Sequence, residues 1–123
     1  MNSIAHLAGR IMLALIFVLS GLGKIHDPAG TAGYMQSVGL PAMLLWPTIA
    51  LEVLGGIALV IGFQTRLVAF ALAVFTLIAA AFFHTNFADQ IQMIMFLKNV
   101  AIAGGLLLLV SSGATAFSVD SRR

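Results

Sequence analysis

The stretch FLKNVAIAGGLLLLV, Phe96 to Val110, is an apolar run that contains one charged residue, Lys98, next to Asn99. A run of this kind is typical of a membrane-spanning helix, because about 20 residues at 1.5 Å per residue cross ~30 Å of hydrocarbon. A charged side chain inside a span is costly, and such residues usually mark a functional site. Lys98 therefore raises the question of what polar group it meets.

The composition of the whole chain agrees with a membrane location. Its 123 residues are 61% hydrophobic and 8% charged, and the mean hydropathy is +1.10. Soluble domains carry about 25% charged residues, so this chain has too few polar groups to cover a surface in water. Six basic and four acidic residues are also too sparse for nucleic-acid binding. Because the chain has no cysteine, disulfides and thiol chemistry are excluded.

Four apolar stretches predict an all-α fold, an integral membrane four-helix bundle in a single domain. They cover residues 4–22, 42–63, 67–86 and 91–110. The connection between the first two is long, and Asp27 followed by proline is a typical helix start. We expect a short interfacial helix over about 28–38, closed by Gly39, with Tyr34 and Met35 toward lipid.

Four spans place both termini on one side of the membrane. That side collects four arginines, Arg10, Arg66, Arg122 and Arg123. The opposite side holds one basic flanking residue, Lys24. Because basic residues beside spans favour the cytoplasm, the sequence predicts that both termini are cytoplasmic.

Polar residues from all four spans fall in the half of the bundle away from the termini. Glu52 lies roughly 13–15 Å into the second span and Lys98 roughly 10 Å into the fourth. Each isolated charge would cost ~2.5–3.5 kcal/mol on insertion scales, so we expect Glu52 and Lys98 to form an ion pair. Ser20, Lys24 and His84 lie at the same end. The alternatives are that Lys98 extends toward water along its own helix, and that the pair is purely structural.

Small residues lie on the same predicted helix faces as these charges. Gly55 and Gly56 follow Glu52 at three and four residues, and Gly105 follows Lys98 at seven. Small residues at such spacing let helices approach closely in lipid. On the first span, one inward stripe is expected at Arg10, Ala14, Phe17, Gly21 and Lys24.

The sequence shows no catalytic, phosphate-binding or metal-binding motif. No pair of histidine or carboxylate residues has ligand spacing, so no metal site is predicted. His84 either joins the polar site or caps the end of its span.

Five segments together resemble the DoxX family of small bacterial membrane proteins. They are GRIMLALIFVLSGLGKIHDP, YMQSVGLP, LEVLGGIALVIGFQTR, AFFH and FLKNVAIAGGLLLL. The resemblance runs from residue 9 to about 110 and implies a four-helix bundle in the bacterial inner membrane. The shared polar positions that it implies are Arg10, Ser20, Gly21, Lys24, Glu52, Arg66, His84, Lys98 and Asn99.

The resemblance also implies a link to respiratory or oxidative-stress redox processes, since the family name comes from a subunit of an archaeal thiosulfate:quinone oxidoreductase. We expect a quinone-like or other lipophilic or anionic ligand, with a quinone as the candidate cofactor. The candidate binding residues are Ser20, Lys24, Glu52, His84, Lys98 and Asn99, whereas Arg10 and Arg66 are expected to be structural.

Two other functions are compatible with the sequence. The chain could be a non-catalytic accessory or scaffold subunit of a membrane complex, or a small transporter or proton-conducting protein. Its partners would be the lipid bilayer and either a partner subunit or further copies of itself. Whether it is an enzyme is left open, because no catalytic motif is present.

Overall fold

The computed structural model describes residues 2–83, 88–113 and 118–120, and this part of the chain is helical with no strand. The elements are α1 (Asn2–His26), α2 (Pro28–Ser37), η1 (Ala42–Leu44), α3 (Leu45–Ile61), α4 (Thr65–Phe83) and α5 (Gln90–Ser112). Four segments in it are long and apolar enough to cross a membrane: 4–26, 42–61, 65–82 and 90–112. The predicted all-α fold with four spans is confirmed, although the predicted end of the third span, 84–86, lies outside the described residues.

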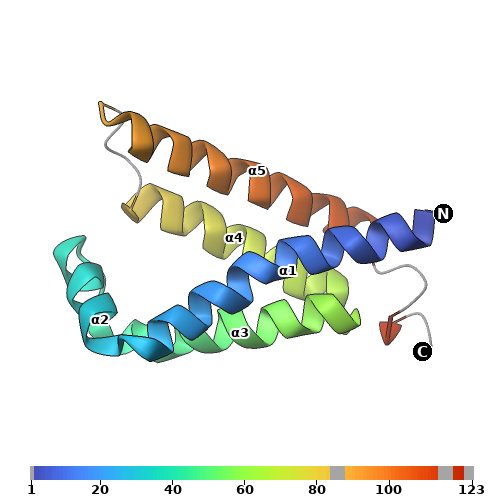
Figure 1. Cartoon of the computed structure of the whole chain (residues 1–123), viewed down its shortest axis with the longest axis horizontal. Helices are drawn as coiled ribbons and strands as arrows, with labels where there is room; N and C mark the ends of the chain where they lie inside the picture. Colours follow the sequence, from blue (N-terminus) through green and yellow to red (C-terminus); the bar gives the residue numbers. More distant parts are fainter. Residues whose placement is uncertain (1, 84–87, 114–117, 121–123) are drawn as a thin grey trace.

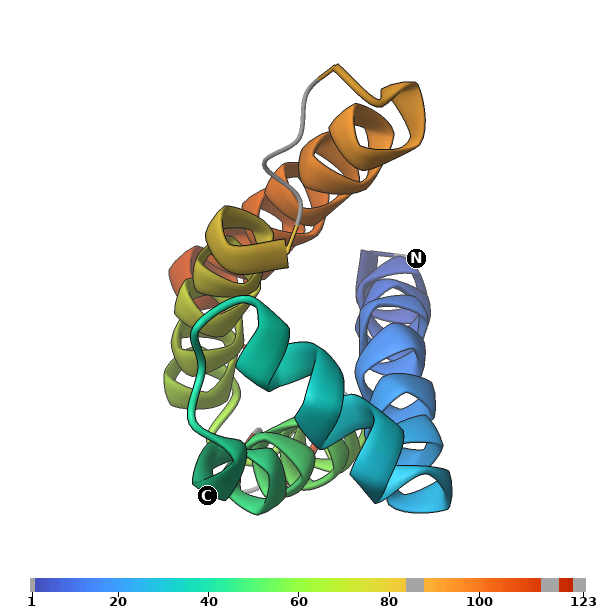
Figure 2. The same ribbon diagram turned by 90° about the vertical axis from the view of Figure 1, so that its left-hand side faces the viewer.

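The short helix α2 forms where the sequence predicts it. The Asp27 carboxylate accepts a hydrogen bond from the Gly30 amide at 3.1 Å, and Pro28 occupies the first turn. Gly39 follows the helix with a φ of 89°, a left-handed conformation that favours glycine. The chain then turns into η1 and α3, so that α2 crosses one end of the bundle (Figure 2).

The spans associate as two pairs, α1 with α3 and α4 with α5 (Figures 1 and 2). Glycine allows the close approach of α1 and α3: a Cβ atom on Gly56 would lie 3.2 Å from the Ala14 carbonyl oxygen and even closer to the Val18 side chain. Gly21 of α1 is similarly close to Val53 of α3. The predicted role of these small residues is confirmed.

The two pairs meet through α3 and α4, where Gly55 packs against the Leu72 side chain. A buried core joins the four spans there: Ala14, Phe17, Leu59, Ala69, Leu72, Ala73, Ala103, Leu106 and Leu109. Toward α2 the pairs diverge, and α5 stands away from α1 (Figure 2).

At the opposite end, residues 118–120 return to the turn between α3 and α4. The amide of Val119 donates to Ile61, and the Asp120 carboxylate accepts from the amides of Gln64 and Thr65, both at 2.8 Å. Asp120 thereby supplies the acceptor that the first turn of α4 lacks. These residues lie at the same end of the molecule as the start of α1 (Figure 1), in agreement with an even number of spans.

Candidate functional site

An ion pair between Lys24 of α1 and Glu52 of α3 forms the centre of the polar region. The distance from Lys24 Nζ to Glu52 Oε1 is 2.6 Å, and the two side chains are 25% and 5% exposed. Gly21, one turn before Lys24, brings α1 so close that its Cβ would lie 3.3 Å from the Cβ of Glu52. The carboxylate is thus neutralised by the neighbouring helix of its own pair.

The predicted ion pair between Glu52 and Lys98 is wrong. Glu52 is paired with Lys24, and Lys98 has no ion-pair partner within the described residues. The physical reason is the helix arrangement: α3 packs against α1, whereas α5, which carries Lys98, packs against α4. Similar depth in the membrane does not determine which helices are neighbours.

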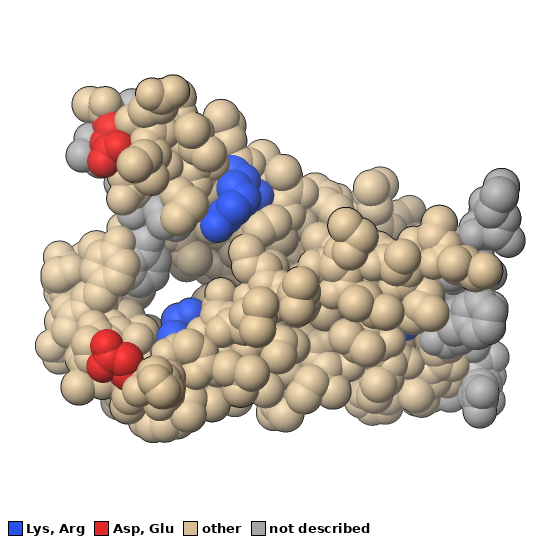
Figure 3. All heavy atoms as spheres, in the orientation of Figure 1, with Lys and Arg blue, Asp and Glu red and all other residues tan. Residues whose placement is uncertain are grey.

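A cavity of about 650 Å³ lies among Lys24, Glu52 and Lys98. It is at the end of the bundle where the two helix pairs diverge and where α2 lies. Figure 3 shows the molecule hollowed at this end, with basic side chains on both sides of the hollow. All three residues line the cavity, Lys24 and Glu52 from the first helix pair and Lys98 from the second. The cavity therefore lies between a neutralised pair and an uncompensated ammonium group.

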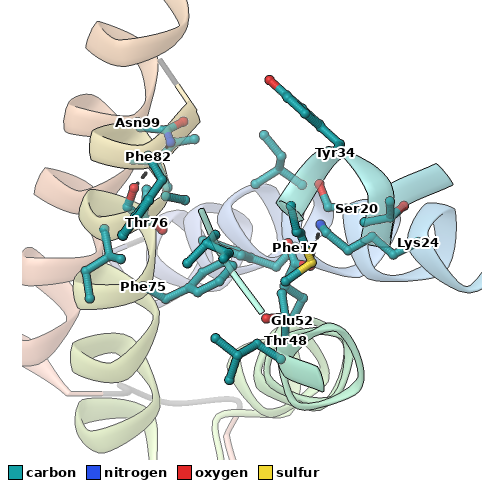
Figure 4. A pocket seen from close by; sticks show the side chains of 18 of the residues that line it. Phe17, Ser20, Lys24, Tyr34, Thr48, Glu52, Phe75, Thr76, Phe82 and Asn99 are labelled. Atoms are coloured by element: carbon teal, nitrogen blue, oxygen red, sulfur yellow. Dashed lines mark hydrogen bonds and ion pairs between the residues drawn. The ribbon is translucent and has the colours of Figure 1, made fainter. Parts of the chain in front are cut away.

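Five of the six candidate binding residues line this one cavity: Ser20, Lys24, Glu52, Lys98 and Asn99. The sixth, His84, lies outside the described residues. Asn99 also joins two helices, because its Nδ2 atom donates to the Thr76 carbonyl oxygen of α4 at 3.2 Å (Figure 4). The Thr76 hydroxyl in turn donates to the Leu72 carbonyl one turn earlier.

The sequence analysis missed several residues of the cavity wall. Met35, predicted to face lipid, lines the cavity instead and is buried against Leu45 and Ile49. Tyr34 has the same prediction and also lines the cavity, but about half of its side chain remains exposed. The reason is that α2 folds back over the bundle end, so the face assigned to lipid covers the cavity. Thr48, one turn before Glu52 on α3, also lines the wall. Its position on the Glu52 face is the signal that could have identified it.

Most of the cavity wall is apolar. Aromatic rings contribute from two helices, with Phe17 on α1 and Phe75 and Phe82 on α4 (Figure 4). Such a mixture, a mainly apolar wall with a few convergent polar groups, is typical of small-molecule sites. The Thr31 and Thr76 hydroxyls of the wall already donate to backbone carbonyl oxygens. The donors that remain for a ligand are the Lys98 ammonium and the Ser20 and Thr48 hydroxyls. Within the described residues, no three His, Cys, Asp or Glu side chains gather as a metal site would require.

The two arginines that the sequence analysis treated as structural lie at the far end of the bundle. Arg10 is fully buried, and its Nη1 atom donates to the carbonyl oxygens of Leu59 and Val60 at 3.2 and 3.3 Å. Arg66 Nη2 donates to the Ser112 carbonyl oxygen at 3.4 Å. Both therefore contact the carbonyl ends of helices, where a positive charge is favourable.

This fold and cavity define a small multi-pass helical membrane protein with a mainly apolar cavity, lined in part by polar residues, between its spans. The sequence model of the family described as DoxX matches residues 5–85. The chain belongs to the DoxX family.

Its relatives include named bacterial proteins. The chain is 42% identical to the inner membrane protein YqjF of Escherichia coli over 120 residues, 98% of this chain and 92% of that protein. It is 41% identical to the inner membrane protein YphA of the same organism over 123 residues, 94% of this chain and 88% of that protein. Together with the four spans, these relatives make the chain a multi-pass inner membrane protein.

A shorter match concerns CatD of Bacillus subtilis, which is provisionally named an oxidoreductase. That protein is 35% identical over 71 residues, which cover 58% of this chain and 52% of CatD. No solved structure matches the chain.

Proposed function

We propose that this protein binds a lipophilic molecule with a quinone-like polar head in the cavity between its two helix pairs. The observation that carries the proposal is the convergence of Ser20, Lys24, Glu52, Lys98 and Asn99 on one mainly apolar cavity of about 650 Å³. Aromatic and aliphatic walls suit the ring of such a head, and the polar groups suit its oxygens.

Lys98 is the residue that we assign to the ligand. An ammonium group at this depth is costly without a partner, and none of the described residues forms an ion pair with it. A carbonyl or phenolate oxygen of a bound quinone would accept a hydrogen bond from Lys98, with Ser20 as a second donor. Glu52 is already neutralised by Lys24, so its role would be to hold Lys24 or to accept a proton from the head.

A redox role is the second part of the proposal, and it rests on similarity. The name of CatD refers to an oxidoreductase, and quinones carry electrons in membranes. Because this chain has no cysteine, it cannot use dithiol chemistry. We therefore propose that electrons reach the bound head from a partner subunit, and that this chain supplies the binding site.

The proposed orientation places the cavity in the periplasmic half of the membrane. The arginines Arg10 and Arg66 lie at the opposite end of the bundle from Lys24 and Lys98, and positive charge favours the cytoplasmic side. A reporter fused to either terminus, active only in the cytoplasm, tests this orientation.

Substitution of Lys98 tests the binding site. In nanodiscs, a decyl-tailed benzoquinone should raise the melting temperature of the wild-type protein and of Lys98→Arg, but not of Lys98→Met. Without ligand, Lys98→Met should be at least as stable as the wild type, because it removes a charge that has no ion-pair partner among the described residues. Glu52→Gln is less informative, since it also leaves Lys24 unpaired.

The matched control is Leu97→Met, which changes an exposed neighbour that does not line the cavity. It should behave as wild type. Equal melting shifts in the wild type and Lys98→Met would reject the assignment of Lys98 to the ligand.

A further inference from the structure

A second cavity lies between α1 and α5, toward the end that holds the arginines. Its volume is about 430 Å³, and its lining surface is almost entirely apolar. The wall includes Gly9, Met12 and Leu13 of α1 and Gly105, Leu108 and Leu109 of α5. Neither the ion pair nor the proposed head site uses it.

On α1, the two cavities follow one another along one helix face. Ser20 and Ile16 line the first cavity, and Leu13 and Gly9 line the second. These four residues recur at intervals of three and four, which places them on a single face.

On α5, the two cavities likewise follow one another along one helix face. Lys98 and Ile102 line the first cavity, and Gly105 and Leu109 line the second. Their spacing is again four, three and four residues. One face of α1 and one face of α5 thus form a continuous seam that contains both cavities.

The length of the seam suits a hydrocarbon chain. From Lys98 to Leu109 the seam runs roughly 16 Å at 1.5 Å per residue, about half of the ~30 Å hydrocarbon core. The cavities are separated where the Leu13 side chain packs on Gly105, with a Cβ at Gly105 lying 3.3 Å from Leu13 Cδ2. A tail that extends from the first cavity into the second must therefore displace the Leu13 side chain.

We infer that the second cavity holds the hydrocarbon tail of the ligand whose polar head occupies the first. The inference rests on the proposed function, and it extends that function to a long-tailed, membrane-resident ligand. A head held at Lys98 leaves its tail inside the membrane, and the seam is the apolar path that begins beside the head. The competing occupants are an ordinary lipid chain and a helix of a second copy.

Two photoactivatable quinone probes test the inference in the full chain in nanodiscs. One carries a diazirine on the ring, the other at the end of a long isoprenoid tail. The ring probe should label the first cavity. The tail probe should label Leu13 and Leu109, the less exposed leucines of the second cavity, and excess unmodified long-tailed quinone should abolish this labelling.

Two matched glycine variants sharpen the test. A Cβ at Gly9 or at Gly104 would meet no atom within 4 Å, so a side chain can start at either position without a clash. Only Gly9 lines the second cavity. Gly9→Leu should lose most of the tail labelling and keep the ring labelling. Gly104→Leu should keep both.

The outcomes separate the two proposals. Ring labelling combined with tail labelling of lipid-facing residues such as Leu15 and Leu97 would overturn the tail site and leave the head site standing. Tail labelling of the second cavity that unmodified quinone does not displace would assign the cavity to ordinary lipid and overturn the inference. If neither probe labels the cavities, the proposed function is rejected, and the inference with it.

Discussion

The helix pairs α1/α3 and α4/α5 have the same kind of contact at the end of the bundle near the start of α1. In each pair, an arginine of the first helix donates to carbonyl oxygens at the end of the second. Arg10 contacts Leu59 and Val60, and Arg66 contacts Ser112. Each helix end is followed by a glycine with positive φ, where a Cβ would collide with the arginine of its pair.

At the cavity end the pairs differ. The first pair neutralises its charges internally through Lys24 and Glu52. The second pair joins its helices with a neutral hydrogen bond from Asn99 to Thr76 and leaves Lys98 exposed on the cavity wall. This difference supports the proposal above, in which Lys98 of the second pair contacts the ligand while the charges of the first pair neutralise each other.

The largest expected effect comes from breaking the ion pair of the first helix pair. Lys24→Met should lower the free energy of unfolding by about 3 kcal/mol, the lower end of the range for buried pairs, because Lys24 is 25% exposed. SDS titration of the folded fraction measures this.

The double variant Lys24→Met with Glu52→Met is the control for that prediction. It should recover most of the loss, because no unpaired carboxylate remains. A double variant as unstable as Lys24→Met would show that the loss comes from packing and not from the unpaired, buried charge of Glu52.

The two arginines should differ in importance despite their similar contacts. Arg10→Met should cost about 2 kcal/mol, because it leaves buried carbonyl groups without a donor, and Arg66→Met less than about 1 kcal/mol, because Arg66 is exposed. The same SDS titration compares them. Equal losses would contradict the prediction that the difference in burial between Arg10 and Arg66 determines their effects on stability.

A small effect on stability is also expected at the hydrogen bond between α4 and α5 in the second pair. Asn99→Ala should cost about 1 kcal/mol, within the range measured for hydrogen bonds between membrane helices. Val100→Ala, at an exposed neighbouring position, is the matched control. If both variants lose the same free energy of unfolding, the hydrogen bond from Asn99 to the Thr76 carbonyl oxygen makes no specific contribution to stability.

Local patterns explain why much of the fold could be predicted. The lengths of the apolar runs determine the four spans, and Asp27 with Pro28 determines the start of α2. The inward stripe of α1 follows from helical spacing alone, and Arg10 and Gly21 are buried as expected. These features depend on residues within a few positions of one another.

The candidate site could be predicted only in part, because depth along a helix does not identify its neighbours. The similar positions of Ser20, Glu52 and Lys98 along their spans predict that they lie in one region, and they do line one cavity. Depth could not show that Lys24 is nearer to Glu52 than Lys98 is. Likewise, the contact of Asp120 with the amide of Thr65, 55 residues earlier, has no local signal in the sequence.

The ion pair between Lys24 and Glu52 also has a consequence for biosynthesis. Its partners are 28 residues apart in the chain, so the ribosome completes the first span well before it reaches the carboxylate. At about 5–20 residues per second, the interval is roughly 1–6 s. During this interval the nascent first helix holds an ammonium group without its counter-ion, and it must remain beside the translocation machinery or near the lipid headgroups until the next span emerges.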